Sequence, residues 1–284
     1  MIRKLLSAPY PVYKLNRRRM WIILGVGAFV AAFLLLFQPF GTDRMQFPNK
    51  RLFLAGYGVV ISLTMLLAES VLNQLVFNKY RDELWTVGKQ LIWVFIFITL
   101  TLAASYLYKQ IFFGLALRLD DFIDFYAMTF SIAVLPVIFI TLLDYNYQLR
   151  KNQSVAAGIQ PVGGSLSAGN SDAQLTLLAE NKKDQLRLSP NDLVYLQSAD
   201  NYVEILFREN GQIKKSLLRN TLQRLTEQIK AQHIMRCHRS FTVNLHQVAK
   251  VSGNAQGYKL HIRESDLRIP VSRSRSKEVL ARLR

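Results

Sequence analysis

The chain has 284 residues, half of which are apolar, and its formal net charge is +17. A single cysteine, Cys237, excludes an intrachain disulfide and a cysteine-based metal cluster. This length allows two modest domains. The second of them is polar and basic, because residues 172–284 hold 20 Lys and Arg against 11 Asp and Glu. Such an excess of positive charge favours a polyanionic partner.

Residues 1–19 are basic and precede the first apolar run. Arg3, Lys4, Lys14 and residues 17–19 carry positive charge, and no acidic residue lies among them. Because basic flanks of a membrane span stay in the cytoplasm, the N-terminus is expected there. The apolar run continues into Gln38-Pro39-Phe40-Gly41 without a small-residue cleavage site. This predicts a retained span and not a removed signal peptide.

Four apolar stretches have about the ~20 residues that a helix needs to cross a bilayer. They cover residues 20–37, 52–77, 85–108 and 122–143. Helices buried in a soluble bundle would show a polar stripe with a period of 3.6 residues, and this stripe is almost missing from the third and fourth stretches. The sequence therefore predicts an all-α transmembrane domain over residues 20–143. Four crossings place both termini in the cytoplasm of a multi-pass inner-membrane protein.

Glu69 is a carboxyl group inside the second apolar stretch. A carboxyl at membrane depth is costly and marks a functional site by default. The alternative is that this end of the long stretch already lies at the inner interface, and we favour that interpretation. The four stretches lack paired charges and repeated Gly or Pro breaks, which disfavours a transporter.

After residue 143 the composition becomes polar, and residues 154–171 are rich in glycine and serine. Gly/Ser-rich segments behave as flexible coils. The sequence therefore predicts a flexible linker over residues 144–171 and a separate domain over residues 172–284. A linker of this kind would transmit a helix movement only weakly.

The apolar residues of the last domain recur with a period of two, which is typical of strands. Strands are expected over residues 193–196, 202–207, 212–216, 241–243, 248–251, 257–262 and 267–270. Asn210-Gly211 predicts a tight hairpin, and residues 199–201 a turn. Asn220 is expected to cap a short helix over residues 221–231, and a last helix is expected over residues 276–283. The domain is thus predicted to be mostly β with one or two short helices.

Five sequence blocks carry a resemblance to a known family. They are Val194-Tyr195-Leu196, residues 199–203, residues 218–222, residues 236–241 with Val243-Asn244, and Ile269-Pro270-Val271-Ser272-Arg273. In this order and spacing, residues 175–284 resemble the LytTR DNA-binding family. The four apolar stretches with Gln38-Pro39-Phe40 are similar to a membrane-bound bacterial subgroup of it. The resemblance implies an elongated β fold that places loops in successive major grooves of double-stranded DNA.

The resemblance assigns base contacts to three places, which are the turn around Asn201 and Tyr202, Arg239, and Arg273. The chemistry agrees, because arginine reads guanine edges with two hydrogen bonds and asparagine can read adenine. Phosphate contacts or supporting roles are expected for a further set of polar side chains, namely His238, Ser240, Arg219, Ser274, Arg275 and Lys277.

Simpler interpretations stand beside these assignments. An isolated loop arginine is more often a solvated charge, and His238 either contacts DNA or fixes its own loop. Cys237 is expected to be a small core residue, and Asn244 to satisfy backbone groups in a turn. The spacing of His233, His238 and His246 matches no zinc site, so no metal is predicted.

The sequence therefore predicts a membrane-anchored, sequence-specific transcription regulator without a cofactor. A homodimer on DNA is also expected, because such families commonly read repeated half-sites. The alternative is a membrane sensor whose basic cytoplasmic module binds a protein partner or anionic lipid. An enzyme such as a histidine kinase is disfavoured, since no glycine-rich nucleotide loop follows a strand and no catalytic pair is present.

Overall fold

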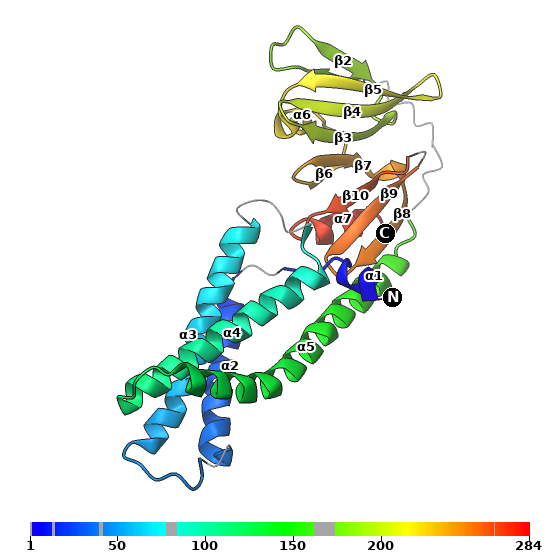
Figure 1. Ribbon diagram of the computed structural model, residues 1–284. Helices are drawn as coiled ribbons and strands as arrows, with labels where there is room; N and C mark the ends of the chain where they lie inside the picture. The colour runs from blue at the N-terminus through cyan, green and yellow to red at the C-terminus, as the bar shows by residue number, and fades with distance from the viewer. Residues whose placement is uncertain (1, 13–14, 40–41, 78–83, 162–173, 264) are drawn as a thin grey trace. The chain divides into compact units, whose positions relative to one another are not determined.

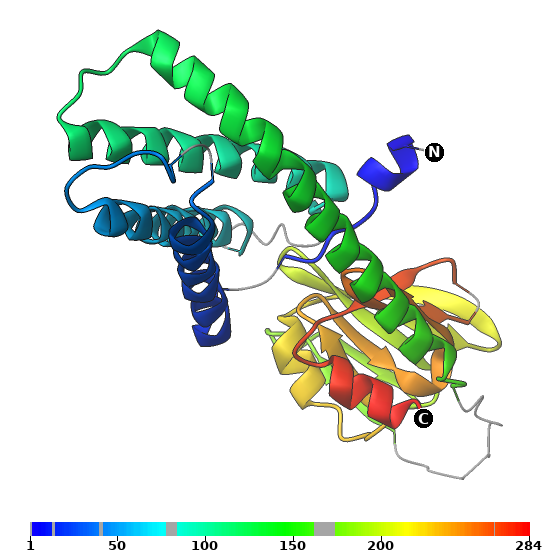
Figure 2. The ribbon, with the colours of Figure 1, turned by 90° about the horizontal axis from the view of Figure 1, so that it is seen from below.

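The computed structural model describes residues 2–12, 15–39, 42–77, 84–161, 174–263 and 265–284 (Figures 1 and 2). The chain divides into two compact units, residues 1–146 and residues 147–284. The first unit is helical, and the second is mostly β. The helix α5 begins in the first unit and ends in the second.

The first unit contains α1 (Ile2–Leu6), α2 (Arg17–Phe37), α3 (Lys50–Phe77), α4 (Val87–Phe113) and most of α5 (Leu119–Ala157). By length and composition, the last four helices are apolar enough to cross a membrane. The sequence predicted all four, with different ends. Thr86 caps α4 by accepting a hydrogen bond from the Lys89 amide, and Gly114 closes it in the left-handed conformation. The helix therefore runs from residue 87 to residue 113 and not from 85 to 108.

Helices α2 and α3 lie in close contact at a pair of glycines. A Cβ atom at Gly27 would overlap the carbonyl of Gly58, and one at Gly58 would overlap the carbonyl of Gly27. Small residues let helix backbones approach in this way. The first turn of α2 also meets α3 through Arg19, whose Nη1 lies 2.9 Å from both carboxylate oxygens of Glu69. Glu69 is thus paired with a cation at a helix end.

The second unit contains three antiparallel sheets. A two-stranded sheet pairs β1 (Leu175–Leu178) with β2 (Gln185–Leu188). A five-stranded sheet has the order β5 (Gln212–Arg219), β4 (Tyr202–Glu209), β3 (Leu193–Ala199), β7 (Phe241–Asn244) and β6 (Ile234–His238). A three-stranded sheet has the order β10 (Arg268–Val271), β9 (Gly257–Ile262) and β8 (Val248–Asn254). The helices α6 (Leu222–Glu227) and α7 (Ser276–Arg282) complete the unit.

Two hydrophobic clusters lie within this unit. One joins Leu196, Val203 and Ile205 of the five-stranded sheet to β1, β2 and α6. The other joins Tyr195 and Val243 of that sheet to β8, β9, β10 and α7. The expected mostly-β domain with short helices is therefore confirmed, and it gains three strands that the sequence did not predict, β1, β2 and β6.

Two local predictions met different outcomes. Asn210 and Gly211 have φ angles of 51° and 77° between β4 and β5, so the predicted tight hairpin is confirmed. The predicted helix over residues 221–231 was too long, and its cap was wrong. Thr221 caps α6 by accepting a hydrogen bond from the Arg224 amide. The Asn220 side chain instead donates to the carbonyl of Leu178, at the end of β1.

The predicted linker needs a correction at its start. Helix α5 continues through Ala157, and Ala156 and Ile159 are buried in the cluster formed with β8 and β9. The Asn152 side chain donates to the carbonyl of Asn254 at 2.7 Å. Residues 144–157 contain no glycine, so the helix has no reason to stop before Gly158. The centre of the predicted linker, residues 162–173, lies outside the described residues.

Candidate nucleic-acid interface

Sheet topology brings Asn201, Tyr202, Arg219 and Arg239 to one end of the five-stranded sheet. Ala199 pairs with Tyr202 across the β3–β4 turn, and Tyr202 pairs with Arg219 at the end of β5. Gln197, near the end of β3, pairs with Phe241 at the start of β7. The turns that carry Asn201 and Arg239 therefore lie at the same end as Arg219. β3 and β7 are distant in sequence but are neighbours in the sheet, so the turns next to them meet at this end.

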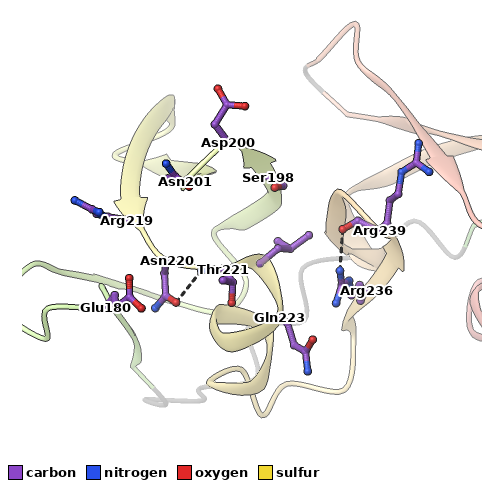
Figure 3. Close-up of a pocket in the computed structure, with 11 residues that line it drawn as sticks. Glu180, Ser198, Asp200, Asn201, Arg219, Asn220, Thr221, Gln223, Arg236 and Arg239 are labelled. Atoms are coloured by element: carbon purple, nitrogen blue, oxygen red, sulfur yellow. Dashed lines mark hydrogen bonds between the residues drawn. The ribbon is translucent and has the colours of Figure 1, made fainter. Parts of the chain in front are cut away.

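An open hollow of about 460 Å³ lies at this end (Figure 3). Its lining is polar and mixed in charge, with three arginines and two carboxylates. The residues are Glu180, Ser198, Asp200, Asn201, Arg219, Asn220, Thr221, Leu222, Gln223, Arg236 and Arg239. Of the two carboxylates, Glu180 forms an ion pair at 2.8 Å with Arg224. Asp200 stands in the left-handed conformation with φ of 50°, which makes the β3–β4 turn tight.

The β6–β7 turn is held by hydrogen bonds from several directions. His238 is buried, and its Nδ1 accepts from the Ser240 amide at 3.3 Å. The Ser240 carbonyl accepts from the Ser198 amide of β3 at 3.0 Å. The side chain of Arg239 is exposed. Of the two interpretations of His238, this geometry fits the one in which the ring fixes its own loop.

The segment after β10 is held against β6. The Ser272 amide donates to the Cys237 carbonyl at 2.9 Å, and Nη1 of Arg275 donates to the Arg236 carbonyl at 3.2 Å. Arg273 and Ser274 are exposed on this segment, and Lys277 is exposed in the first turn of α7. These three residues lie outside the hollow, on a neighbouring loop tied to the same strand.

Tyr202 and Arg275 differ from the other predicted contacts. Tyr202 lies outside the hollow at the start of β4, with 46% of its surface exposed. Arg275 is half-buried, and its guanidinium bonds to protein backbone. The structure thus brings Asn201, Arg219 and Arg239 into one hollow and places the others around it.

Cys237 and Asn244 have the surroundings that the simpler interpretations predicted. Cys237 is fully buried, and burial raises the pKa of its thiol to about 12, so it stays protonated. Asn244 is also fully buried; its amide donates to the carbonyls of Pro190 and Leu193, and its oxygen accepts from the His246 amide. Both residues are therefore buried parts of the fold.

His233 and His246 stack at the opposite end of β6 and β7, with ring centroids 4.3 Å apart and planes inclined by 6°. Burial, and then repulsion from His246, lowers the pKa of His233. Among the described residues, no group of three His, Cys, Asp or Glu side chains could hold a metal ion.

Asp200, Gln223 and Arg236 line the hollow but were not predicted from the sequence to contact DNA. Arg236 lies within a block that carried the family resemblance, but a resemblance does not say where its side chain points. A carboxylate such as Asp200 can accept a hydrogen bond from cytosine, and a glutamine can read adenine. Together with Asn201 and Arg239, the hollow can offer groups that recognise base edges as well as phosphates.

Comparisons with known proteins identify the domain that carries this hollow. The family model described as the LytTr DNA-binding domain matches residues 183–284. An uncharacterized response regulatory protein of Vibrio cholerae is 28% identical over 101 residues, which are 36% of this chain and 38% of that protein. The chain therefore spans well under half the length of this curated relative. A solved LytTr DNA-binding domain from Bacillus cereus is 20% identical, with a TM-score of 0.31, and the match covers 39% of this chain and 95% of that one.

Proposed function

Because residues 183–284 form a LytTr DNA-binding domain, we propose that this protein is a transcription regulator anchored in the inner membrane. In this proposal the loops at one end of the five-stranded sheet read base edges in the major groove. The observation that carries the proposal is the gathering of Asn201, Arg219 and Arg239 around one open hollow. Arg273 is exposed on an adjoining loop that is tied to the same strand.

The chemistry of the loops supports separate roles in recognition. Arg239 and Arg273 are exposed, and each guanidinium group has two N–H donors that fit the O6 and N7 atoms of guanine. Asn201 has an amide that fits adenine, and Tyr202 offers an exposed ring beside it. Arg219, Ser274 and Lys277 are exposed and suit phosphate contacts. His238 and Ser240 support the turn, because the His238 ring accepts from the Ser240 amide and the Ser240 carbonyl accepts from the Ser198 amide.

The helical unit supports the membrane part of the proposal. Each of its four long helices contains an 18-residue stretch apolar enough to cross a membrane, and much of the apolar surface of these helices is exposed. The backbone hydrogen bonds of a helix are satisfied internally, as a bilayer requires. In the proposal both termini lie in the cytoplasm, where the DNA is, because basic residues precede α2 and the number of crossings is even. Two copies on repeated half-sites complete the proposal.

The test uses the full chain in lipid nanodiscs. A duplex selected for binding and a scrambled duplex of the same composition are titrated at several salt concentrations. The proposal expects tighter binding to the selected duplex and a linear fall of log affinity with log salt. Arg239→Ala should remove most of the preference, whereas Arg187→Ala, an exposed arginine of β2, should leave it unchanged. Equal affinity of the wild-type protein for both duplexes would refute sequence-specific binding.

A second arm addresses anionic lipid. The titrations of the full chain are repeated in nanodiscs with and without anionic phospholipid. Without DNA, binding of the nanodisc-held chain to separate vesicles of anionic phospholipid is also measured. Lipid binding ignores base sequence. A protein that binds anionic surfaces tightly but shows no preference among duplexes would favour a membrane sensor over a transcription regulator.

A further inference from the structure

Two arginines of the second unit direct their side chains at backbone carbonyls of the β6–β7 region. Arg236 donates from Nε to the His238 carbonyl at 3.3 Å and from Nη2 to the Arg239 carbonyl at 2.8 Å (Figure 3). Arg275 donates from Nη1 to the Arg236 carbonyl at 3.2 Å. The two side chains thus form a relay from the segment after β10 to the turn that carries Arg239.

This arrangement needs the shape of arginine. The register between β6 and β7 shifts between Arg236 and His238, so the strand is irregular just before the turn. The planar guanidinium of Arg236 reaches two successive carbonyls at once with donors in a fixed fork. A lysine has a compact ammonium group at the end of a flexible chain and lacks that fork.

The same turn is the meeting point of three loops. Its Ser240 carbonyl accepts from Ser198, which lies near the β3–β4 turn, and the Cys237 carbonyl accepts from Ser272, which precedes Arg273. With the arginine relay, these bonds join the loops that carry Asn201, Arg239 and Arg273. A change in the β6–β7 turn would therefore move all three.

We infer that Arg236 and Arg275 are positioning residues for DNA recognition, which hold the Arg239 turn and the Arg273 loop in one fixed arrangement. This inference rests on the proposed function. It also assigns Arg275 a role different from the phosphate contact expected from sequence, because its guanidinium bonds to the Arg236 carbonyl and the residue is half-buried. Pre-organised loops bind more tightly because less conformational freedom is lost on association.

Phosphate contact and positioning predict different measurements. Removing a phosphate contact weakens binding to all duplexes and lowers the salt slope by about one unit. Lysine restores much of such a contact, because the charge matters more than the fork. Removing a positioning residue lowers affinity for the selected duplex, leaves the salt slope and scrambled binding unchanged, and is not rescued by lysine at residue 236.

The experiment compares the full-length wild-type protein in nanodiscs with Arg236→Ala, Arg236→Lys and Arg275→Ala. Lys277→Ala, which removes an exposed proposed phosphate contact of α7, is the reference for a phosphate contact and should weaken binding to both duplexes. Affinities for selected and scrambled duplexes are measured over a range of salt, and amide hydrogen exchange is followed in residues 236–241. We expect Arg236→Ala and Arg236→Lys to lose about tenfold in affinity for the selected duplex only. Both variants and Arg275→Ala should exchange faster in residues 236–241, and Lys277→Ala should not.

Unchanged exchange in residues 236–241 of the Arg236 variants would overturn the inference, as would equal loss on both duplexes with a shallower salt slope. Circular dichroism and thermal unfolding check that each variant is folded, and Arg236→Lys keeps the charge if Arg236→Ala does not fold. If the wild-type protein shows no preference between duplexes, the proposed function fails. The exchange measurement still decides whether the arginines hold the turn.

Discussion

The helical unit and the β unit use apolar side chains in opposite ways. In the helical unit, Leu36, Phe37 and Ile111 are 70–79% exposed. In the β unit, Leu177, Leu196 and Leu260 are fully buried. A unit that must fold in water hides its apolar surface, whereas helices surrounded by lipid have no such driving force between them. The contrast is the one that the proposed membrane anchor requires of the helical unit.

Packing follows the same division. Helices α2 and α3 approach at Gly27 and Gly58, where backbone meets backbone. The β unit instead interlocks large side chains from both faces of its five-stranded sheet. Truncation of one apolar side chain should therefore lower the unfolding free energy much more in the β unit than in the helical unit.

The largest effect is expected from Leu196→Ala in β3. Leu196 is fully buried, so the change should cost about 2–5 kcal/mol of the β unit's unfolding free energy through lost burial and a cavity. Leu63→Ala in α3 is the matched change at a side chain that is 61% exposed, and it should cost less than about 0.5 kcal/mol. Hydrogen exchange of the full chain in nanodiscs measures both. Similar costs would contradict the contrast between the units.

Gly253→Ala tests the packing of the last turns of α5 within the second unit. A Cβ atom at this position would overlap the Asn152 backbone, which cannot move away as a flexible side chain would. We expect a loss of about 1–3 kcal/mol in stability, with faster hydrogen exchange in residues 152–159. Gly25→Ala in α2 is the control, because nothing lies within 4 Å of the added atom. Unchanged exchange in residues 152–159 would show that this contact does not hold α5.

Arg273→Ala tests recognition without touching either core. We expect a loss of about 1–3 kcal/mol in binding to the selected duplex and relaxed preference at one base pair. The variant is compared with Arg187→Ala by fluorescence anisotropy on selected and single-base-changed duplexes. If Arg273→Ala weakens selected and random duplexes equally, the residue contacts phosphate and does not read a base.

The smallest effect is a pH dependence from His233. The pKa of His233 in the folded protein lies below the ordinary histidine value of 6.5, so the folded state takes up a proton less readily than the unfolded state. Stability from the neutral ring is therefore full above about pH 6.5 and falls as pH decreases from there toward the folded pKa. Thermal unfolding measured from about pH 7.5 to about pH 5, a range that includes the ordinary histidine pKa, should show this decline.

Two variants sharpen the pH prediction. His233→Gln should flatten the decline, because the titrating ring is gone. His246→Gln should flatten it less, since burial contributes more than His246 to the lowered pKa. An unchanged pH profile in His233→Gln would mean that other groups cause the decline.

Local features were predictable from sequence. The Asn210-Gly211 hairpin has the two residues that adopt positive φ angles with least strain. The four long helices follow from apolar runs of sufficient length. The candidate contact residues came from a family resemblance, and the structure adds the sheet order that gathers three of them around the hollow.

Features set by distant contacts were not predictable. β6 contains Arg236 and His238 among its five residues, so it lacks a clear alternation of apolar and polar side chains. The strand forms because it pairs with β7. The end of α5 was assigned to a linker because the sequence becomes polar after residue 143 and rich in glycine and serine from residue 154. Its helix persists where Ala156 and Ile159 find a buried surface on the β unit. The side-chain direction of Arg236 depends on a turn that only the folded sheet defines.

Selection of bound duplexes from a random pool by the full chain in nanodiscs tests the central claim most directly. The account predicts enrichment of a defined sequence, and loss of that enrichment in a protein carrying both Arg239→Ala and Arg273→Ala. A pool that remains random after repeated rounds with the wild-type chain would contradict it.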